Sequence, residues 1–360
     1  MRRITVLACA VLATLLVLAA CGGDRKGALA SIPANATILG SVQPKRTLQD
    51  KQLQDVFATA AKDTPFGVTG LDFVVTALEK QTGVDLRQID EITLAFVGDP
   101  VGAGMAATGG SGMAPEITRV VFFKGSFDQA KIIESMKRGS GRTVNTMSYK
   151  GQDVLSPDES TAVAFLQEDL LAIGNQAGVK AAIDVRKGDA PAISGRFVNS
   201  FKNLRDPLVK VSVAVPKDAI RNAIKGGTGN GPIQIDPQLF EQVNTIGFTL
   251  SKQGQKIAMT LAVDYPTADD ARRAREGFNG LLQFFKAFGG KALEGQKGLN
   301  KAFDSVRITN LGSQLNVTLF LTPADLKDAI EGINTLASSL GGLGGMMGGG
   351  NLPGKRPFGP

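Results

Sequence analysis

Short stretches rich in β-branched and aromatic residues occur in pairs along most of the chain, each pair separated by a turn or a loop. In the four clearest pairs the stretches lie at 91–97 and 117–123, 162–166 and 170–173, 245–251 and 256–263, and 305–309 and 315–321. Residues of this type in runs of four to nine, bounded by turn residues, favour β-strands, and close spacing favours antiparallel pairing. The pattern therefore predicts repeated hairpins.

Each strand pair is followed by a segment whose apolar residues recur three and four positions apart, which is the period of one helix face. These segments lie at 128–138, 176–185, 268–288 and 323–340. Three of them start after a Ser or Thr that stands three positions before an acid or amide, namely at Ser126, Thr267 and Thr322. This is the spacing of a capping box, and Ser126 with Gln129 matches it best because Gln suits the third helical position.

The order strand, strand, helix occurs twice in each half of the chain. Each half also begins with a strand and a helix, the strands lying at 37–42 and 209–215. We therefore expect an α+β fold of two similar modules, at 31–190 and 194–340, each an antiparallel sheet with helices packed on one face as tandem ββα units. The alternative is a single continuous sheet with layered helices.

The N-terminus has the features of an export signal. Met1-Arg2-Arg3 forms a short basic region, residues 4–18 are almost entirely apolar, and Leu18-Ala19-Ala20-Cys21-Gly22 follows. The apolar run is shorter than the roughly 20 residues that a transmembrane helix needs. We therefore interpret residues 1–20 as a signal peptide that is removed.

Small residues before Cys21 resemble the lipobox of bacterial lipoproteins. The resemblance implies that Cys21 carries diacylglycerol, that its new amine is acylated, commonly with palmitate, and that the protein is held in the cell envelope on the extracytoplasmic side. An Asp after the cysteine would resemble an inner-membrane retention signal. Gly22 stands there instead, which favours the periplasmic side of the outer membrane if the organism has two membranes. Residues 21–30 then form a linker, and the Gly-rich residues 341–360 a disordered tail.

Composition excludes several kinds of chemistry. The 360 residues include no His and no Trp, so the commonest general base and transition-metal ligand is missing. Of the two cysteines, Cys9 leaves with the signal and Cys21 is the lipidation site. The net charge of +7 falls to +5 when Arg2 and Arg3 are removed. The remaining basic residues are scattered, so we expect no nucleic-acid binding.

Motifs that hint at chemistry are weak. Gly102–Ala107 fits a dinucleotide fingerprint, but the glycines that follow prevent the helix that such a site needs. Gly349–Lys355 fits most of a phosphate loop but precedes no helix. Paired carboxylates that could serve glycoside hydrolysis occur at Asp158–Glu159, Glu168–Asp169 and Asp269–Asp270. Sugar sites usually stack their ligand on Trp or Tyr, which are scarce here. We interpret these pairs as turns, caps and solvated faces.

The sequence therefore predicts no catalytic, cofactor-binding or metal-binding residue, and Cys21 is its one candidate site. The favoured hypothesis is a lipid-anchored, non-catalytic binding or assembly protein of the bacterial cell envelope. Its partners would be the membrane, through Cys21, and an envelope protein. The alternative is a carrier for a lipid or another apolar ligand, since a sheet covered by apolar helices can enclose a cavity. An enzyme that uses carboxylates or serine alone is the third hypothesis.

Overall fold

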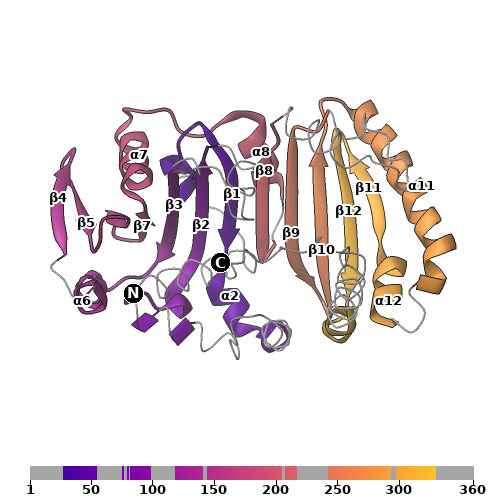
Figure 1. Cartoon of the computed structure of the whole chain (residues 1–360), viewed down its shortest axis with the longest axis horizontal. Coiled ribbons are helices and arrows are strands. Elements are labelled where there is room, and N and C mark those ends of the chain that lie inside the picture. The colour runs from indigo at the N-terminus through magenta and orange to yellow at the C-terminus, as the bar shows by residue number, and fades with distance from the viewer. Residues whose placement is uncertain are drawn as a thin grey trace, which may run out of the picture.

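The computed structural model places all of its strands in one sheet (Figure 1). It describes residues 27–54, 75–76, 79–80, 82–98, 118–140, 144–204, 207–216, 242–292 and 297–329. The sheet has 12 strands in the order β11-β12-β10-β9-β8-β1-β2-β3-β7-β6-β5-β4, and every pair is antiparallel. The mixture of antiparallel sheet and helices is the expected α+β class.

The strands are β1 (Ala36–Val42), β2 (Ile89–Val97), β3 (Thr118–Gly125), β4 (Asn145–Tyr149), β5 (Gln152–Ser156), β6 (Ala162–Gln167), β7 (Leu170–Gly174), β8 (Val209–Ala214), β9 (Thr245–Gln253), β10 (Lys256–Asp264), β11 (Arg307–Leu311) and β12 (Gln314–Leu321). The α-helices are α2 (Pro44–Gln49), α6 (Gln129–Ser140), α7 (Gln176–Lys187), α8 (Gly195–Asn203), α11 (Ala268–Ala292) and α12 (Lys297–Ser305), and the 3-10 helices are η1 (Ala28–Ser31) and η2 (Leu86–Gln88).

The strand pairs expected from sequence are confirmed, as are the helices that became α6, α7 and α11. Four elements were not predicted from the sequence, namely the strands β4 and β5 and the helices α8 and α12. Most of the helix predicted at 323–340 lies outside the described residues, as does the helix expected after the strand at 209–215. The signal peptide, Cys21, Gly102–Ala107 and the tail lie outside them as well. Among the helices that are described, none has the length and apolarity to cross a bilayer.

The two halves of the chain join in a single sheet, which is the alternative that the sequence analysis left open. They meet where β1 pairs with β8, with Ile38 opposite Val213 and Val42 opposite Val209. Outward from this seam the strand order is β1-β2-β3-β7-β6 in one half and β8-β9-β10-β12-β11 in the other. The first half adds β5 and β4 at its outer end.

Helices cover both faces of the sheet, so the expectation of helices on one face is wrong. In β1, β2 and β3, alternate residues such as Leu39, Ala95 and Phe122 pack with α7 and α8. Residues of the opposite parity in the same strands, such as Val42, Leu94 and Phe123, pack with α6. Both sets are apolar, and successive strand residues point to opposite faces. A strand that is apolar on both faces needs a cover on each, which the ββα pattern alone did not reveal.

Two of the three predicted helix starts are capped as expected. The amide of Asp270 donates to the hydroxyl of Thr267, and the amide of Asp325 donates to that of Thr322, each at 3.2 Å. The start at Ser126 is different, although its sequence matched best. There the carboxylate of Asp128 accepts from the amide of Lys131 at 3.0 Å. Asp is an equally good cap, and it stands directly before the first residue of α6.

A buried polar cluster lies beside the seam between the two halves. The hydroxyl of Ser41 on β1 donates to the carboxylate of Glu91 on β2. Lys210 on β8, opposite Ser41, is 6% exposed, and its ammonium lies 4.4 Å from the ring centre of Phe201. Burial raises the pKa of Glu91, although Ser41 and the charges of Lys210 and Lys124 act in the opposite direction.

Stability should therefore depend on pH through Glu91. A carboxyl whose pKa is higher in the folded state binds its proton more tightly there. The free-energy cost of burying its charge is therefore absent below pH 4.5, and it is complete at a pH above the raised pKa of the folded state. Relative to Glu91→Gln, the wild type should gain stability as the pH falls towards 4.5.

Asp270 should show the opposite trend. The Thr267 hydroxyl lowers the pKa of Asp270, so relative to Asp270→Asn the wild type should lose stability below pH 3.8. Urea unfolding between pH 3 and 8 measures both trends. If the free energy of unfolding changed with pH equally in the wild type and in a variant, the pKa shift assigned to that residue would be contradicted.

Candidate functional site

The β4–β5 hairpin forms one outer end of the sheet (Figure 1). Its two strands pair over five positions, from Asn145 opposite Ser156 to Tyr149 opposite Gln152. By contrast, β5 pairs with β6 only through Leu155 and Val163. Along its outer side, β4 pairs with no strand of the described chain. Within the described part of the chain, the hairpin therefore ends the sheet with an unpaired backbone edge.

The hairpin turn is attached firmly to α7. Its two residues, Lys150 and Gly151, have φ angles of +52° and +75°, which is typical of the tight turn that fits the twist of a hairpin. The hydroxyl of Tyr149 donates to Asp184 of α7 at 3.0 Å. The ammonium of Lys150 lies 2.5 Å from a carboxylate oxygen of Asp184 and 2.7 Å from one of Asp189. The bond to Asp184 raises the pKa of Tyr149. These contacts hold β4 in place from one end.

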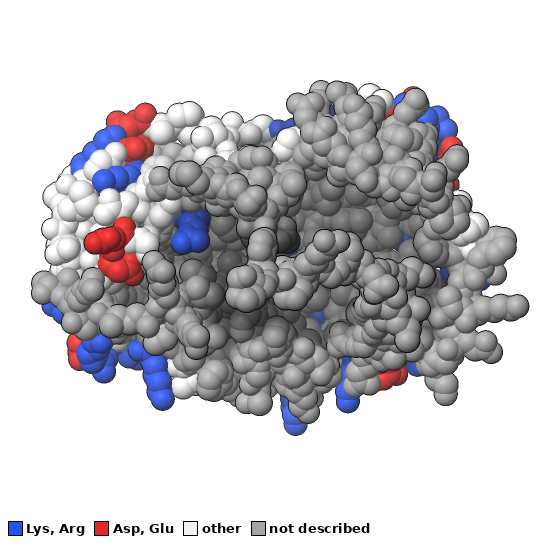
Figure 2. Space-filling model, in the orientation of Figure 1, with Lys and Arg blue, Asp and Glu red and all other residues white. Residues whose placement is uncertain are grey.

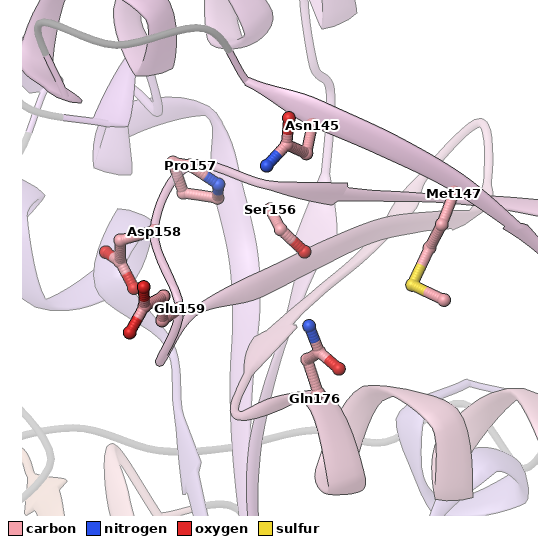
Figure 3. A pocket seen from close by; sticks show the side chains of 7 residues that line it. All are labelled: Asn145, Met147, Ser156, Pro157, Asp158, Glu159 and Gln176. Atoms are coloured by element: carbon pink, nitrogen blue, oxygen red, sulfur yellow. The ribbon is translucent and has the colours of Figure 1, made fainter.

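A pocket lies at the other end of the hairpin, against the N-terminus of α7 (Figure 3). Its volume is about 280 Å³. Its lining comes from β4, from β5 and the loop that follows, and from the first residue of α7. The lining residues are Asn145, Met147, Ser156, Pro157, Asp158, Glu159 and Gln176. The volume suits one side chain or a small ligand, since pockets for drug-sized molecules start at about 300 Å³.

Ser156 has a hydroxyl that the fold leaves without a partner. The residue is 9% exposed, and its Oγ makes no hydrogen bond in the described structure. Figure 3 shows the side chains of Ser156 and Gln176 pointing toward one another across the pocket. A buried hydroxyl without a hydrogen bond costs about 1–3 kcal/mol. Such a group, in the lining of a pocket, is suited to a ligand that supplies the missing bond.

Two carboxylates border the pocket. The amide and the hydroxyl of Ser160 each donate to Asp158 at 2.8 Å. Burial acts to raise the pKa of Asp158, but the bonds from Ser160 and Thr161 outweigh it and hold the pKa below its usual value. Glu159 beside it is exposed. The pocket therefore has an acidic rim at neutral pH.

The N-terminus of α7 is already capped from within the protein. The side-chain oxygen of Asn175 accepts from the amide of Gly178 at 3.0 Å and from the amide of Arg119 at 3.2 Å. It thereby joins the start of α7 to the start of β3. This cap positions Gln176, the first helical residue, at the wall of the pocket.

The three carboxylate pairs of the sequence lie on separate elements. Asp158–Glu159 borders the pocket, Glu168–Asp169 forms the β6–β7 turn, and Asp269–Asp270 begins α11. The last two match the interpretation as turns and caps, whereas the first has a place in a candidate site. Among the residues that the structure describes, no three acids lie close enough to hold a metal ion.

Asn145, Ser156 and Gln176 were not predicted as site residues from the sequence, because the hairpin itself was not predicted. The one local signal was Gly151, at the second position of a tight turn. Lys150 before it is uncommon at a positive φ, where Asn or Asp usually indicates this turn.

Charges on the described surface are mixed. In the view of Figure 2, acidic and basic side chains lie beside one another at the hairpin end, and the lower rim has several basic side chains with acidic ones among them. No broad field of one sign covers the described part of this face, which agrees with the scattered charges of the sequence.

No family model matches the chain, and no curated protein matches it. Solved structures with a similar chain path include three crystal forms of a protein titled TP0453. Form III is 9% identical, with a TM-score of 0.46, and the match covers 86% of this chain and 98% of that one. Forms I and IV are 12% and 9% identical, with TM-scores of 0.42 and 0.45, over 86% and 84% of this chain and 97% and 95% of theirs. Identities and scores of this size identify no family and no function.

Proposed function

We propose that this chain is a lipid-anchored, non-catalytic binding protein of the bacterial cell envelope, and that it captures an extended segment of an envelope protein at β4. The observation that carries the proposal is an open edge strand beside a pocket lined partly by that strand. Asn145 and Met147 belong to both. An added strand gains affinity from backbone hydrogen bonds and specificity from pockets for alternate side chains.

The edge is prepared for such binding. Tyr149 and Lys150 hold the hairpin on α7, so β4 loses little conformational entropy when a partner strand pairs with it. In a two-residue hairpin the residues beside the turn share hydrogen bonds, and the bonding alternates from there. Thr146 and Ser148 therefore direct their backbone groups toward the open side.

The lipid anchor limits where the partner can be. Gly27, the first described residue, is the sixth residue after Cys21, and a fully extended chain over six residue steps reaches about 20 Å. With Cys21 acylated, the start of the described body stays within that distance of the membrane surface. We therefore expect the partner to be an envelope protein at the same membrane.

A photo-crosslinking amino acid at Ser148 tests this proposal in the native envelope. We expect one defined product at Ser148 and none from the same group at Thr309, on the exposed opposite edge strand β11. Thr146→Pro should abolish the product, since proline blocks the open edge while the bonds within the hairpin remain. The proposal fails if Ser148 captures nothing, or if its product survives Thr146→Pro.

One observation favours the second candidate, a carrier for a lipid or another apolar ligand. Val211, Phe248, Leu261 and Val317 lie side by side on four strands, and all are partly exposed. Leu261 is 37% exposed. Native mass spectrometry of the purified protein tests this candidate, which predicts extra mass equal to a phospholipid or a quinone.

The two-module organisation at 31–190 and 194–340 belongs to the same proposal. Its support is the shared strand order outward from the β1–β8 seam. Under this view the β4–β5 hairpin is an addition to the first module alone, and the proposed capture site is specific to that module.

A further inference from the structure

We infer that the pocket beside β4 binds the guanidinium group of an arginine side chain, carried by the extended segment that pairs with β4. The inference rests on the proposed function and names the residue type that the partner presents.

The pocket offers hydrogen-bond acceptors from several elements. Ser156 contributes an unpartnered hydroxyl oxygen, and Asn145 and Gln176 add side-chain amide groups from β4 and α7. The carboxylates of Asp158 and Glu159 complete the set. A guanidinium has five N–H donors and no acceptor, so it can satisfy acceptors that lie in different directions. An ammonium has only three donors.

The lining also has an apolar part. Met147 is 37% exposed, and Pro157 lies beside Ser156 on the pocket wall. Arginine buries its aliphatic stem along such surface while its charged end reaches polar groups. A lining that holds a thioether, a proline ring and two carboxylates therefore matches both parts of an arginine side chain.

The charge of the pocket lining favours a cationic ligand. Two carboxylates border the pocket, and its described lining contains no Lys or Arg. The start of α7 would attract an anion, but its amide at Gly178 already binds the side chain of Asn175. Hydrogen bonds between a guanidinium and carboxylates are about twice as strong as neutral ones. An acidic ligand would meet repulsion at the same place.

Position links the pocket to the strand. Asn145 and Met147 stand two residues apart on β4, so their side chains point to the same face, toward the pocket. A strand added beside β4 lies about 5 Å away and presents every second side chain to that face. A long side chain at one such position reaches the pocket, whereas its neighbours point to the opposite face.

Methyl NMR of the full-length protein, with ¹³C-methyl methionine and detergent around its lipid anchor, provides the test. The probes are N-acetyl-arginine amide and its uncharged isostere N-acetyl-citrulline amide. We expect the Met147 signal to shift with the arginine probe at an affinity at least 10-fold higher than with citrulline. Asp158→Asn combined with Glu159→Gln should reduce that affinity at least 10-fold. Glu168→Gln, which neutralises an acid in the β6–β7 turn, should leave it unchanged.

Serine variants form a matched pair within the same test. Ser156 and Ser212 both have buried hydroxyls without a partner in the described structure, but only Ser156 lines the pocket. Ser156→Ala should weaken arginine binding several-fold, whereas Ser212→Ala should not. Both variants should melt at or above the wild-type temperature, because each removes an unsatisfied buried group. Equal affinities of the two variants for the arginine probe would show that Ser156 does not contribute to binding.

The source of the guanidinium is decided by a second probe, the pentapeptide acetyl-Val-Thr-Arg-Thr-Val-amide. Tighter binding than the single residue, lost in Thr146→Pro, supports an extended segment on β4. Binding no tighter than the single residue overturns that part and indicates a free small molecule. Equal responses to arginine and citrulline, or no response, overturn the inference altogether. In that case a persistent crosslink at Ser148 would still support capture at the edge, so the two failures are distinguishable.

Discussion

Alanine at Gly178 is expected to lower the free energy of unfolding by about 1–3 kcal/mol, the range of an overpacked core. A Cβ at this position would lie 2.2 Å from the carbonyl oxygen of Arg119 and 2.8 Å from its carbonyl carbon. Both atoms are backbone at the start of β3. They cannot move aside easily because Asn175 binds the amides of Arg119 and Gly178 together. The helix must therefore shift away from the sheet, and Gln176 would move with it.

Gly280→Ala, in the long helix α11, is the matched control. Nothing lies within 4 Å of a Cβ built there. Alanine in an open helix interior should raise stability by up to about 1 kcal/mol. Urea unfolding of both variants measures the two effects. Helix propensity by itself predicts a gain at both positions, so gains at both would show that α7 does not approach β3 as closely as the structure indicates.

Cys21→Ser is expected to transfer nearly all of the protein from the membrane to the soluble extracytoplasmic fraction. Under the proposed function, acyl chains on Cys21 provide the attachment, and two or more chains are needed for stable anchoring. Serine cannot form the thioether that holds them. Fractionation followed by mass spectrometry of the N-terminal peptide measures both the location and the lipid.

The other cysteine supplies the control for this experiment. Cys9 lies inside the apolar run, within the segment that we expect to be removed. Cys9→Ser should therefore leave both the location and the N-terminal lipid unchanged. A Cys21→Ser protein that stays in the membrane would contradict the anchoring proposal. So would release of the Cys9→Ser protein.

Local patterns account for much of the fold. The pair that became β9 and β10 was visible because apolar and β-branched residues hold most positions of two nine-residue segments that flank a short turn. The start of α11 was visible because Thr267 and Asp270 satisfy each other within one helical turn. Both signals depend on residues close in sequence, so they could be interpreted without tertiary structure.

The β4–β5 hairpin had no such signal. Four of the five residues of β4 are exposed and none is buried, so there is no buried face for a hydrophobic pattern to reveal. Its stability depends on Asp184, 35 residues after Tyr149 in the sequence. The candidate site is built from this hairpin, and it was therefore not predictable. The pair Asp158–Glu159 was noticed, but its place at a pocket depends on the first turn of α7.

The amino-acid sequence by itself determined the number and kind of most elements, the α+β class and the absence of histidine chemistry. These properties follow from residue identity and short-range periodicity. Tertiary structure decided that the two halves join through β1 and β8, that helices cover both faces, and that Ser156 lines a pocket without a partner. It also decides the effect of alanine at Gly178 and at Gly280. Both glycines lie in helices, and what differs is the distance to a strand 59 residues earlier in the chain, which no local pattern contains.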